Sequence, residues 1–552
     1  MKDKHDFIRQ IIHTKLDCGK SLVELSTYRN ISYWWNLNFQ FCMNLIAVIE
    51  GVRRESRFEP SRFFKRFKRK TRPLTRLFYD VFNRDLYRKL SGKSNFQYKS
   101  KNSKLVIFST RKKLRNVPHG KSGETKPGDF VFSPIIDKLE ENFSLVGIYY
   151  LSGFLPIENY REVKRRSSIE YIHQIPLNRY WNIDIWRTER SAQKQFALAW
   201  KQIRSDKKLR SLCNYHKKDL HSTVMCLLQD YFLDLLPREV KVCALCQNMI
   251  EAENPNMFLS EYEYGPVRKS YSVIAPLTEG IPCIALQHGN IYPTHPGYYY
   301  TPEEISRQGS IQSPYCPIPD KTLVYGPHFK HILVDECNYP GEKVEITGAP
   351  RYDFLKDARN IYSREDFLKR YNLDKKSKII LWTSQTHGLS LQENIANLKA
   401  IISAVKKIEN GVLLIKQHPN EGENCDRLIR EKLNGSEIEY VIAPKDSDAY
   451  GFIAVCDLMI TKFSTTGTEA VLLGKPLLIL NLSGKSDRMD YVDEGVALGV
   501  YKKENLKNTI EGLLRDDSHL AKNREKYIEK YFDGFDGKAT ETVMRFLLER
   551  IC

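Results

Sequence analysis

Short apolar runs alternate with longer segments of helical periodicity along most of the chain. In the first half, helical periodicity is clearest around residues 187–203, 220–251 and 270–277. Four strand candidates precede or separate these segments: KLVIFST from Lys104, the run from Ser144 to Leu151, NMFLSEYEYG from Asn256 and IPCIALQHG from Ile281. Strands that alternate with helices are typical of βαβ units in a parallel sheet. We therefore predict a Rossmann-like domain over residues 101–310.

The alternation restarts after residues 301–320, a stretch with the Pro, Gly, Ser and Gln content of a linker. Seven further runs read as strands: TLVYG, VEITG, KIILWTS, GVLLIKQHP, IEYVIAP, DLMITKFS and PLLILNL. This spacing predicts a second doubly wound α/β domain over residues 311–535, followed by a C-terminal helix over residues 536–552.

Residues 1–100 are predicted to form a basic helical extension. Between Arg53 and Arg76 there are eleven Lys or Arg residues and two Glu residues, interleaved with phenylalanines. Such a segment suits a helix that lies on an anionic membrane surface, and equally a solvated helix whose aromatic rings pack on the enzyme. The charged N-terminus lacks the features of a secretion signal, and the apolar run from Ile31 to Ile49 carries too many Asn and Gln residues to span a bilayer comfortably. We expect a cytoplasmic protein, peripheral on the inner face of the membrane if the first interpretation holds.

Length, charge and motif content limit the classes of function that this chain could have. A chain of 552 residues is too long for a single core, and a formal charge of +19 favours polyanionic partners. No nucleic-acid-binding module is recognisable, so nucleic acid is not an expected partner. Cys243 and Cys246 form a lone CxxC, which fits buried free thiols better than zinc or a redox pair. Neither a P-loop nor a G-x-G-x-x-G follows any predicted strand.

Ligands of open α/β sheets bind beyond the carboxyl ends of the strands, so the residues there are the first candidates for chemistry. His288 follows the run that ends at Leu286 and could act as a general base on an acceptor hydroxyl; a histidine that caps a turn is the structural alternative. Lys416, His418 and Pro419 follow another run, where the histidine could stabilise a departing nucleotide phosphate or belong to an ordinary turn.

Two further strand ends are rich in hydroxyl groups. The segment TKFSTTGTE, from Thr461 to Glu469, opens a predicted helix, and its hydroxyl and backbone N–H groups could hold phosphate. An ordinary helix N-cap would explain one of these hydroxyls and not the cluster. Ser384 and Gln385, in TSQTHG, could reach the phosphates from the other side.

These motifs together resemble the GT-B superfamily of glycosyltransferases, and in particular surface-polysaccharide transferases and CDP-glycerol glycerophosphotransferases. The matching segments are ALQHG, VYGP, ITGAPRYD, KQHP and DLMITKFSTTGTEAVLLGKP. The last segment is also similar to UDP-N-acetylglucosamine 2-epimerases, although those carry a Ser-Gly-Gly with paired glutamates where this chain has Ser-Thr-Thr-Gly and a single Glu469.

The resemblance implies two Rossmann-like domains that face a cleft, with no resident metal or cofactor. It implies donor binding by the second domain through His418, Ser464, Thr465, Thr466 and Glu469. It also implies a catalytic base in the first domain, for which His288 is the first candidate and Glu261 and Glu263 are alternatives.

The expected function is transfer from a nucleotide-activated donor to a saccharide or lipid-linked acceptor in surface polysaccharide synthesis. A UDP-sugar 2-epimerase and a non-catalytic membrane-associated scaffold are the alternatives.

Overall fold

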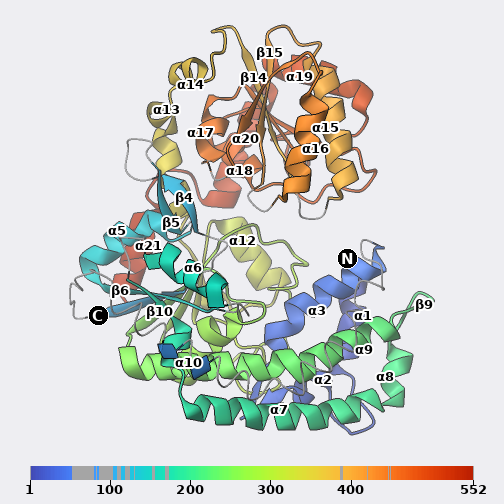
Figure 1. The fold of residues 1–552 in the computed structure, drawn as a ribbon, viewed down its shortest axis with the longest axis vertical. Helices are drawn as coiled ribbons and strands as arrows, with labels where there is room; N and C mark the ends of the chain where they lie inside the picture. Colours follow the sequence, from blue (N-terminus) through green and yellow to red (C-terminus); the bar gives the residue numbers. More distant parts are fainter. Residues whose placement is uncertain are drawn as a thin grey trace.

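The computed structural model describes residues 2–51, 80–81, 84–85, 103–108, 114–118, 125–129, 131–151, 156–167, 173–385, 389–418, 421–445, 447 and 449–550. These residues form two α/β lobes, one above the other in Figure 1. A layer of long helices closes the far side of the first lobe (Figure 1).

The first lobe is built on a seven-stranded parallel sheet. In sheet order its strands are β13 (Val344–Ile346), β12 (Lys321–Val324), β11 (Cys283–Leu286), β10 (Met257–Ser260), β3 (Lys104–Phe108), β6 (Ser144–Tyr149) and β7 (His173–Pro176). The chain builds outward from β3 in one direction and then returns to β10 and builds in the other. The strand order therefore reverses between β3 and β10, which is the point where such sheets bind ligands.

The second lobe repeats this plan with six parallel strands. In sheet order they are β16 (Glu439–Ala443), β15 (Gly411–Lys416), β14 (Lys378–Thr383), β17 (Leu458–Thr461), β18 (Leu477–Leu480) and β19 (Leu498–Val500). Here the order reverses between β14 and β17. The main flanking helices are α15 (Leu391–Val405), α16 (Glu423–Leu433), α17 (Ala449–Val455), α18 (Thr466–Leu472), α19 (Leu506–Arg515) and α20 (Ser518–Phe532). The predicted pair of doubly wound domains is confirmed.

The predicted boundary at residue 310 is wrong. TLVYG and VEITG were assigned to the second domain, but they form β12 and β13, which extend the first sheet from β11. The first lobe therefore reaches at least to Ile346. The Pro-rich stretch that suggested a linker is a long loop between β11 and β12, which belong to one sheet. The sequence analysis did not predict β7 in the first sheet or β19 in the second.

The N-terminal helices belong to the core of the first lobe and are not a separate extension. They are α1 (Lys2–His13), α2 (Leu22–Leu25) and α3 (Trp34–Ile49). Trp34 and Trp35 are almost fully buried, and the Trp35 indole N–H donates to the carbonyl oxygen of Pro314 at 3.0 Å. The helices beside them are α7 (Ile183–Arg204), α8 (Lys207–Leu212), α9 (His221–Asp230) and α10 (Leu236–Glu253). The stretch between Arg53 and Arg76 lies outside the described residues.

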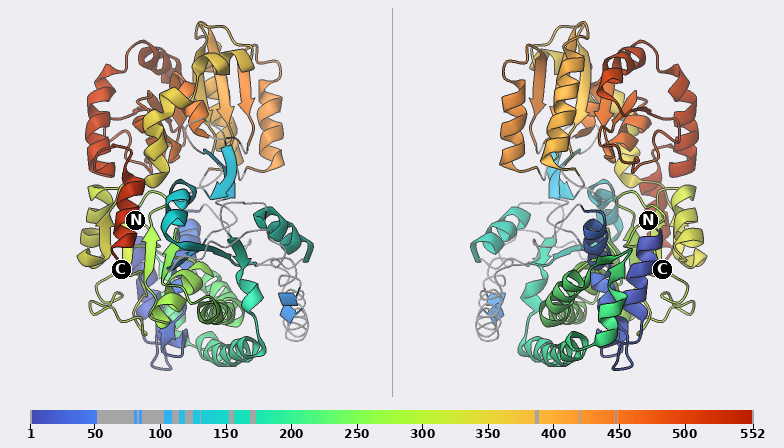
Figure 2. Two further views of the ribbon diagram at one scale, coloured as in Figure 1. Left: turned by 90° about the vertical axis from the view of Figure 1, so that its left-hand side faces the viewer. Right: turned by 90° about the vertical axis from the view of Figure 1, so that its right-hand side faces the viewer.

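The chain crosses between the lobes twice, and the two crossings touch. The first runs through the 3-10 helix η8 (Pro350–Asp357) and α13 (Ala358–Ile361), and the second leads to α21 (Ala539–Leu548). The Asp353 carboxylate accepts the backbone N–H groups of Ala539 and Thr540 at 3.1 and 2.7 Å. Helix α21 then packs beside α5 (Ser133–Asn142) of the first lobe, as the side views show (Figure 2). Among the described residues, no helix combines the length and the apolar character needed to cross a membrane.

Candidate functional site

Arg351 connects the strand ends of the two lobes. It lies at the start of the first crossing, five residues beyond β13, and its side chain is only 4% exposed. Its Nη1 donates to the backbone oxygen of His288 at 3.3 Å, and its Nη2 donates to Oε1 of Glu469 at 2.5 Å. The Arg351 guanidinium therefore places the loop of the candidate base next to the helix that carries the candidate donor residue.

A second contact joins the same two regions. The Asn290 side-chain amide lies 3.5 Å from the sulfur of Met489, in the loop that follows β18. His288 and the segment from Thr461 to Glu469 thus face a shared inter-lobe region, as the two-domain prediction required.

His288 is half-buried and stacked on an aromatic ring. Its imidazole lies 4.6 Å from the ring of Tyr262, centroid to centroid, with an angle of 26° between the planes. Tyr262 follows β10 and His288 follows β11, so the stack joins two neighbouring strand ends beside the reversal point of the first sheet. Stacking fixes the plane of the imidazole, which is what a group that accepts a proton from a bound hydroxyl needs.

Glu261 and Glu263, the alternative bases, are both nearly fully buried. The Glu263 carboxylate accepts a hydrogen bond from Thr322 on β12 at 3.1 Å, so it points into the lobe. Burial raises the pKa of Glu263 to about 7, against the lowering effects of Lys269, Thr322 and Tyr298. Glu263 is therefore better suited to a structural role than to contact with an acceptor. Glu261 directly follows β10 beside the His288 loop and stays a candidate.

In the second lobe, the segment from Ser464 to Glu469 is tied together by its own hydroxyl groups. Ser464 Oγ accepts the N–H of Thr466 at 3.2 Å, and the Thr466 and Thr383 hydroxyls lie 3.3 Å apart. Thr465 stands at the N-cap position of α18 without a side-chain capping bond. The predicted cluster is therefore present at the β14–β17 reversal point, and phosphate binding by it stays a prediction.

Tyr491 braces this segment from the far side. Its hydroxyl donates to the Ser464 oxygen at 3.0 Å and accepts the N–H of Thr468 at 3.1 Å. A Cβ atom at Gly467 would lie 2.8 Å from the Tyr491 ring, so only glycine fits at this position. Gly467 thus allows the segment from Ser464 to Glu469 to pack directly on the Tyr491 ring.

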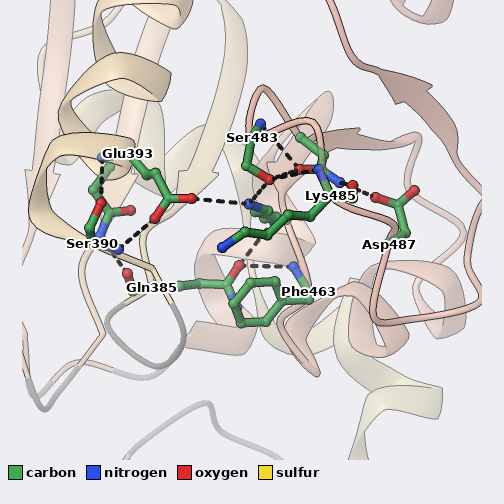
Figure 3. A network of polar contacts seen from close by, with 10 residues as sticks. Gln385, Ser390, Glu393, Phe463, Ser483, Lys485 and Asp487 are labelled. Atoms are coloured by element: carbon green, nitrogen blue, oxygen red, sulfur yellow. Dashed lines mark hydrogen bonds and ion pairs between the residues drawn. The ribbon is translucent and has the colours of Figure 1, made fainter. Parts of the chain in front are cut away.

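Gln385 anchors the loop that leads into α18. Its Oε1 accepts the backbone N–H groups of Lys462 and Phe463 at 3.1 and 2.9 Å, and Figure 3 shows it between the chain at Phe463 and the helix start that carries Ser390 and Glu393. The Gln385 side-chain oxygen therefore binds backbone of the same lobe. Ser384 is buried as well.

Cationic side chains gather around the same loop. Lys462 Nζ donates to Ser483 Oγ at 3.0 Å, and burial lowers the pKa of this lysine. The Arg488 guanidinium lies 4.7 Å from the centre of the Phe463 ring. Figure 3 shows Ser483, Lys485 and Asp487 together on the loop after β18. Sequence reasoning missed this loop, because its Gly484-Lys485-Ser486 lacks the upstream glycine of a P-loop and matches no other binding motif.

The Lys416 side chain contacts neighbouring backbone in the second lobe. Its ammonium group donates to the backbone oxygens of Gln417 and Lys445 at 3.1 and 2.9 Å, which ties the loop after β15 to the loop after β16. His418 is half-buried, and its backbone oxygen accepts the N–H of Glu421. Pro419 lies outside the described residues. Donor binding by Lys416, His418 and Pro419 stays a prediction.

The described residues contain no group of three or more His, Cys, Asp or Glu side chains placed to hold a metal ion. Cys243 and Cys246 are both buried, and burial raises the pKa of each thiol. The structure thus gives this CxxC the packing role of buried thiols.

Residues 271–549, slightly more than half of the sequence, match the family described as CDP-Glycerol:Poly(glycerophosphate) glycerophosphotransferase. The chain belongs to this glycerophosphotransferase family. The matched region contains His288, Arg351 and the segment from Thr461 to Glu469. Of these, Arg351 was missed as a site residue, although its motif ITGAPRYD contributed to the family resemblance.

Among curated proteins, this glycerophosphotransferase family member resembles the teichoic acid poly(ribitol-phosphate) polymerase of Bacillus spizizenii. The two are 24% identical over 221 residues, which cover 37% of this chain and 33% of the polymerase. The match thus spans a third of the length of that relative.

One solved structure supports the fold of the family member, and a second is less similar. The UDP-GlcNAc 2-epimerase of Neisseria meningitidis, bound to UDP-GlcNAc, superimposes with a TM-score of 0.50 at 16% identity, over 81% of this chain and 100% of the epimerase. A wall teichoic acid polymerase structure has a TM-score of 0.45 at 11% identity, over 88% of this chain and 98% of the other. The predicted GT-B architecture is confirmed.

Proposed function

We propose that this protein transfers a polyol phosphate from a CDP-activated donor to a hydroxyl group of a growing cell-surface polymer. The observation that carries the proposal is the Arg351 contact, which brings the His288 loop and Glu469 together within a chain of the glycerophosphotransferase family. The family description names both the donor class and a polyanionic acceptor, and the excess of positive charge in the sequence suits such an acceptor.

The proposed step is a displacement at phosphorus. The acceptor hydroxyl gives its proton to the His288 imidazole, and its oxygen forms a bond to the phosphorus that carries the polyol. The bond from that phosphorus to the bridging oxygen breaks, and the oxygen leaves with the electron pair as part of CMP. The second lobe, through the segment from Ser464 to Glu469 and His418, holds the nucleotide part.

A thermal-shift series with CDP-glycerol, CDP-ribitol, UDP-GlcNAc, CMP-sialic acid and GDP-mannose tests the donor class. A ligand present at a hundred times its Kd stabilises the folded state by about 2.7 kcal/mol, so a CDP-polyol should raise Tm clearly while the others should not. Formation of an epimer from UDP-GlcNAc without any acceptor would instead support the epimerase alternative. No stabilisation by any nucleotide would support the scaffold.

The role of His288 is tested by His288→Ala. Loss of a general base lowers turnover by about 10²–10⁴-fold, and the Kd for CDP-glycerol should stay the same because the imidazole belongs to the first lobe. His331→Ala is a matched control, since His331 is exposed and its ring pairs with Asp335 one helical turn away. Full turnover in His288→Ala would refute the assignment.

We also propose that the enzyme works at the cytoplasmic face of the membrane, attached through the stretch between Arg53 and Arg76. Removal of residues 1–100 would not test this, because it would also remove Trp34 and Trp35 from the core. Substitution of Lys65, Arg66, Lys68, Arg69 and Lys70 by Gln removes five positive charges and leaves all described residues unchanged in sequence. Each cation near an anionic surface contributes about 1 kcal/mol, so binding to phosphatidylglycerol vesicles should fall steeply. Unchanged vesicle binding would contradict the attachment.

A further inference from the structure

Arg268 is a half-buried cation whose contact is with an aromatic ring. Its guanidinium carbon lies 4.1 Å from the centre of the Tyr262 ring. Within the described part of the chain, no carboxylate lies within ion-pair distance of this guanidinium, and no hydrogen bond occupies its N–H groups. Half-buried arginines generally pair with an anion, because their five donors are costly to leave unused.

The ring that holds Arg268 is the ring on which His288 is stacked. The guanidinium and the candidate base therefore contact the same aromatic ring, at the strand ends beside the reversal point of the first sheet. An anion bound by Arg268 would therefore lie at the same strand ends as a hydroxyl presented to His288.

The backbone before Arg268 adopts a conformation that is unfavourable for its sequence. Val267 has a φ of 70°, in the left-handed region that β-branched residues avoid, and Gly265 has a φ of 88°. Strain of this kind persists where the surrounding structure imposes it, and it concentrates at functional sites.

Buried polar contacts hold this conformation. The Val267 N–H donates to Oε2 of Glu239 at 2.7 Å, and the same carboxylate oxygen accepts from Ser270 Oγ and Asn36 Nδ2 at 2.9 Å each. A π-helical turn, η5 (Ser270–Ile274), follows directly. The buried Glu239 carboxylate therefore fixes the backbone that carries Arg268 and so positions Arg268 against Tyr262.

We propose that Arg268, supported by Tyr262, forms an anion subsite that binds the phosphate group next to the reacting hydroxyl of the acceptor. This inference rests on the proposed function. A planar guanidinium can bind a phosphate through two parallel hydrogen bonds, and a poly(glycerophosphate) chain carries a phosphate in every repeat. The subsite belongs to the acceptor and not to the donor, because it lies beside the base on the first lobe while the donor candidates lie on the second.

The test uses the full chain and isothermal titration with a synthetic glycerol-phosphate trimer, with no donor present. Arg268→Gln should weaken trimer binding by about tenfold or more, since a charge-assisted bidentate contact is lost. Arg268→Lys should recover part of this affinity, because it restores the charge without the fork. Arg190→Gln is the matched control: Arg190 also lies over an aromatic ring, that of Trp186, but on α7.

Two further measurements separate the outcomes. CDP-glycerol should bind Arg268→Gln as tightly as it binds the wild type, and the variant should show a raised KM for the trimer but not for triglycerol, an uncharged acceptor. Three results would overturn the subsite. In the first, Arg268→Gln binds the trimer as tightly as the wild type does; in the second, the wild type does not bind the trimer at all. In the third, Arg268→Gln loses affinity for CDP-glycerol only. Trimer binding that depends on Arg268 in a protein that binds no nucleotide would refute the proposed function and leave the subsite standing.

Discussion

Arg351 and Glu469 form an ion pair that is buried on both sides, each side chain being about 4% exposed. The Arg351 side chain also donates to the Tyr352 hydroxyl at 2.6 Å, so its guanidinium is held in several directions at once. A charge in such surroundings is tolerated only while its partner is present, because neither group can be solvated by water. The pair therefore contributes to the relative position of the lobes as well as to the site.

Arg351→Met should destabilise the protein by about 3–5 kcal/mol, because it leaves the Glu469 carboxylate buried without its cation. The double variant Arg351→Met/Glu469→Gln removes both charges and should lose less. Urea unfolding of the two variants and of Glu469→Gln measures the coupling. A loss in the double variant equal to the sum of the two single losses would show that the two groups are not coupled.

The same pair shows what could not be predicted at the residue scale. His288, Ser464 and Glu469 were identified because each follows an apolar run, and this local signal is visible in the sequence. The partner of Glu469 is 118 positions away, and no local pattern reports a contact across that separation. Lys416 and Gln385 carried the same strand-end signal, yet the structure uses their side chains to hold neighbouring backbone.

At the scale of elements, α21 is the last helix of the chain and packs on the first lobe. Val543 and Leu547 are fully buried, in one apolar cluster with Leu105 and Ile107 of β3. Runs of apolar residues predicted nearly every strand of both sheets, but which sheet a strand joins depends on long-range pairing. That is why β12 and β13 were placed in the wrong domain.

Leu547→Ala should therefore destabilise the first lobe by about 2–5 kcal/mol, the range found when a buried leucine is truncated. Leu198→Ala on α7 is a suitable control, since Leu198 is 60% exposed and its truncation should change the unfolding free energy by less than about 0.5 kcal/mol. Thermal unfolding followed by circular dichroism would measure both. A Leu547→Ala protein as stable as the control would show that α21 is dispensable for the lobe.

At the scale of the whole molecule, stability should depend on the protonation of a few buried groups. Burial raises the pKa of Glu263 to about 7, so between pH 4.5 and 7 the folded protein holds a proton that the unfolded chain has released. The contribution of Glu263 to stability is therefore lost as the pH rises through this interval. Burial lowers the pKa of His5 to about 4 and that of His295 to about 3, and these two groups reduce stability as the pH falls below 6.5.

Glu263→Gln isolates the first effect, because both histidines are present in either protein and cancel in the difference. The variant and the wild type should be equally stable near pH 4.5, and the variant should become the more stable by up to about 3 kcal/mol at pH 8. Chemical unfolding at several pH values measures this difference. A difference that does not change with pH would mean that Glu263 is ionised throughout.

The paired crossings at Asp353 and Ala539 limit how the two halves of the enzyme can move. Two adjacent connections that are bonded to each other leave rotation about the line through them as the easiest motion, while twisting and sliding meet resistance. The two lobes would then separate most on the side opposite these connections. The donor and acceptor of the proposed reaction would therefore enter and leave most easily through that side.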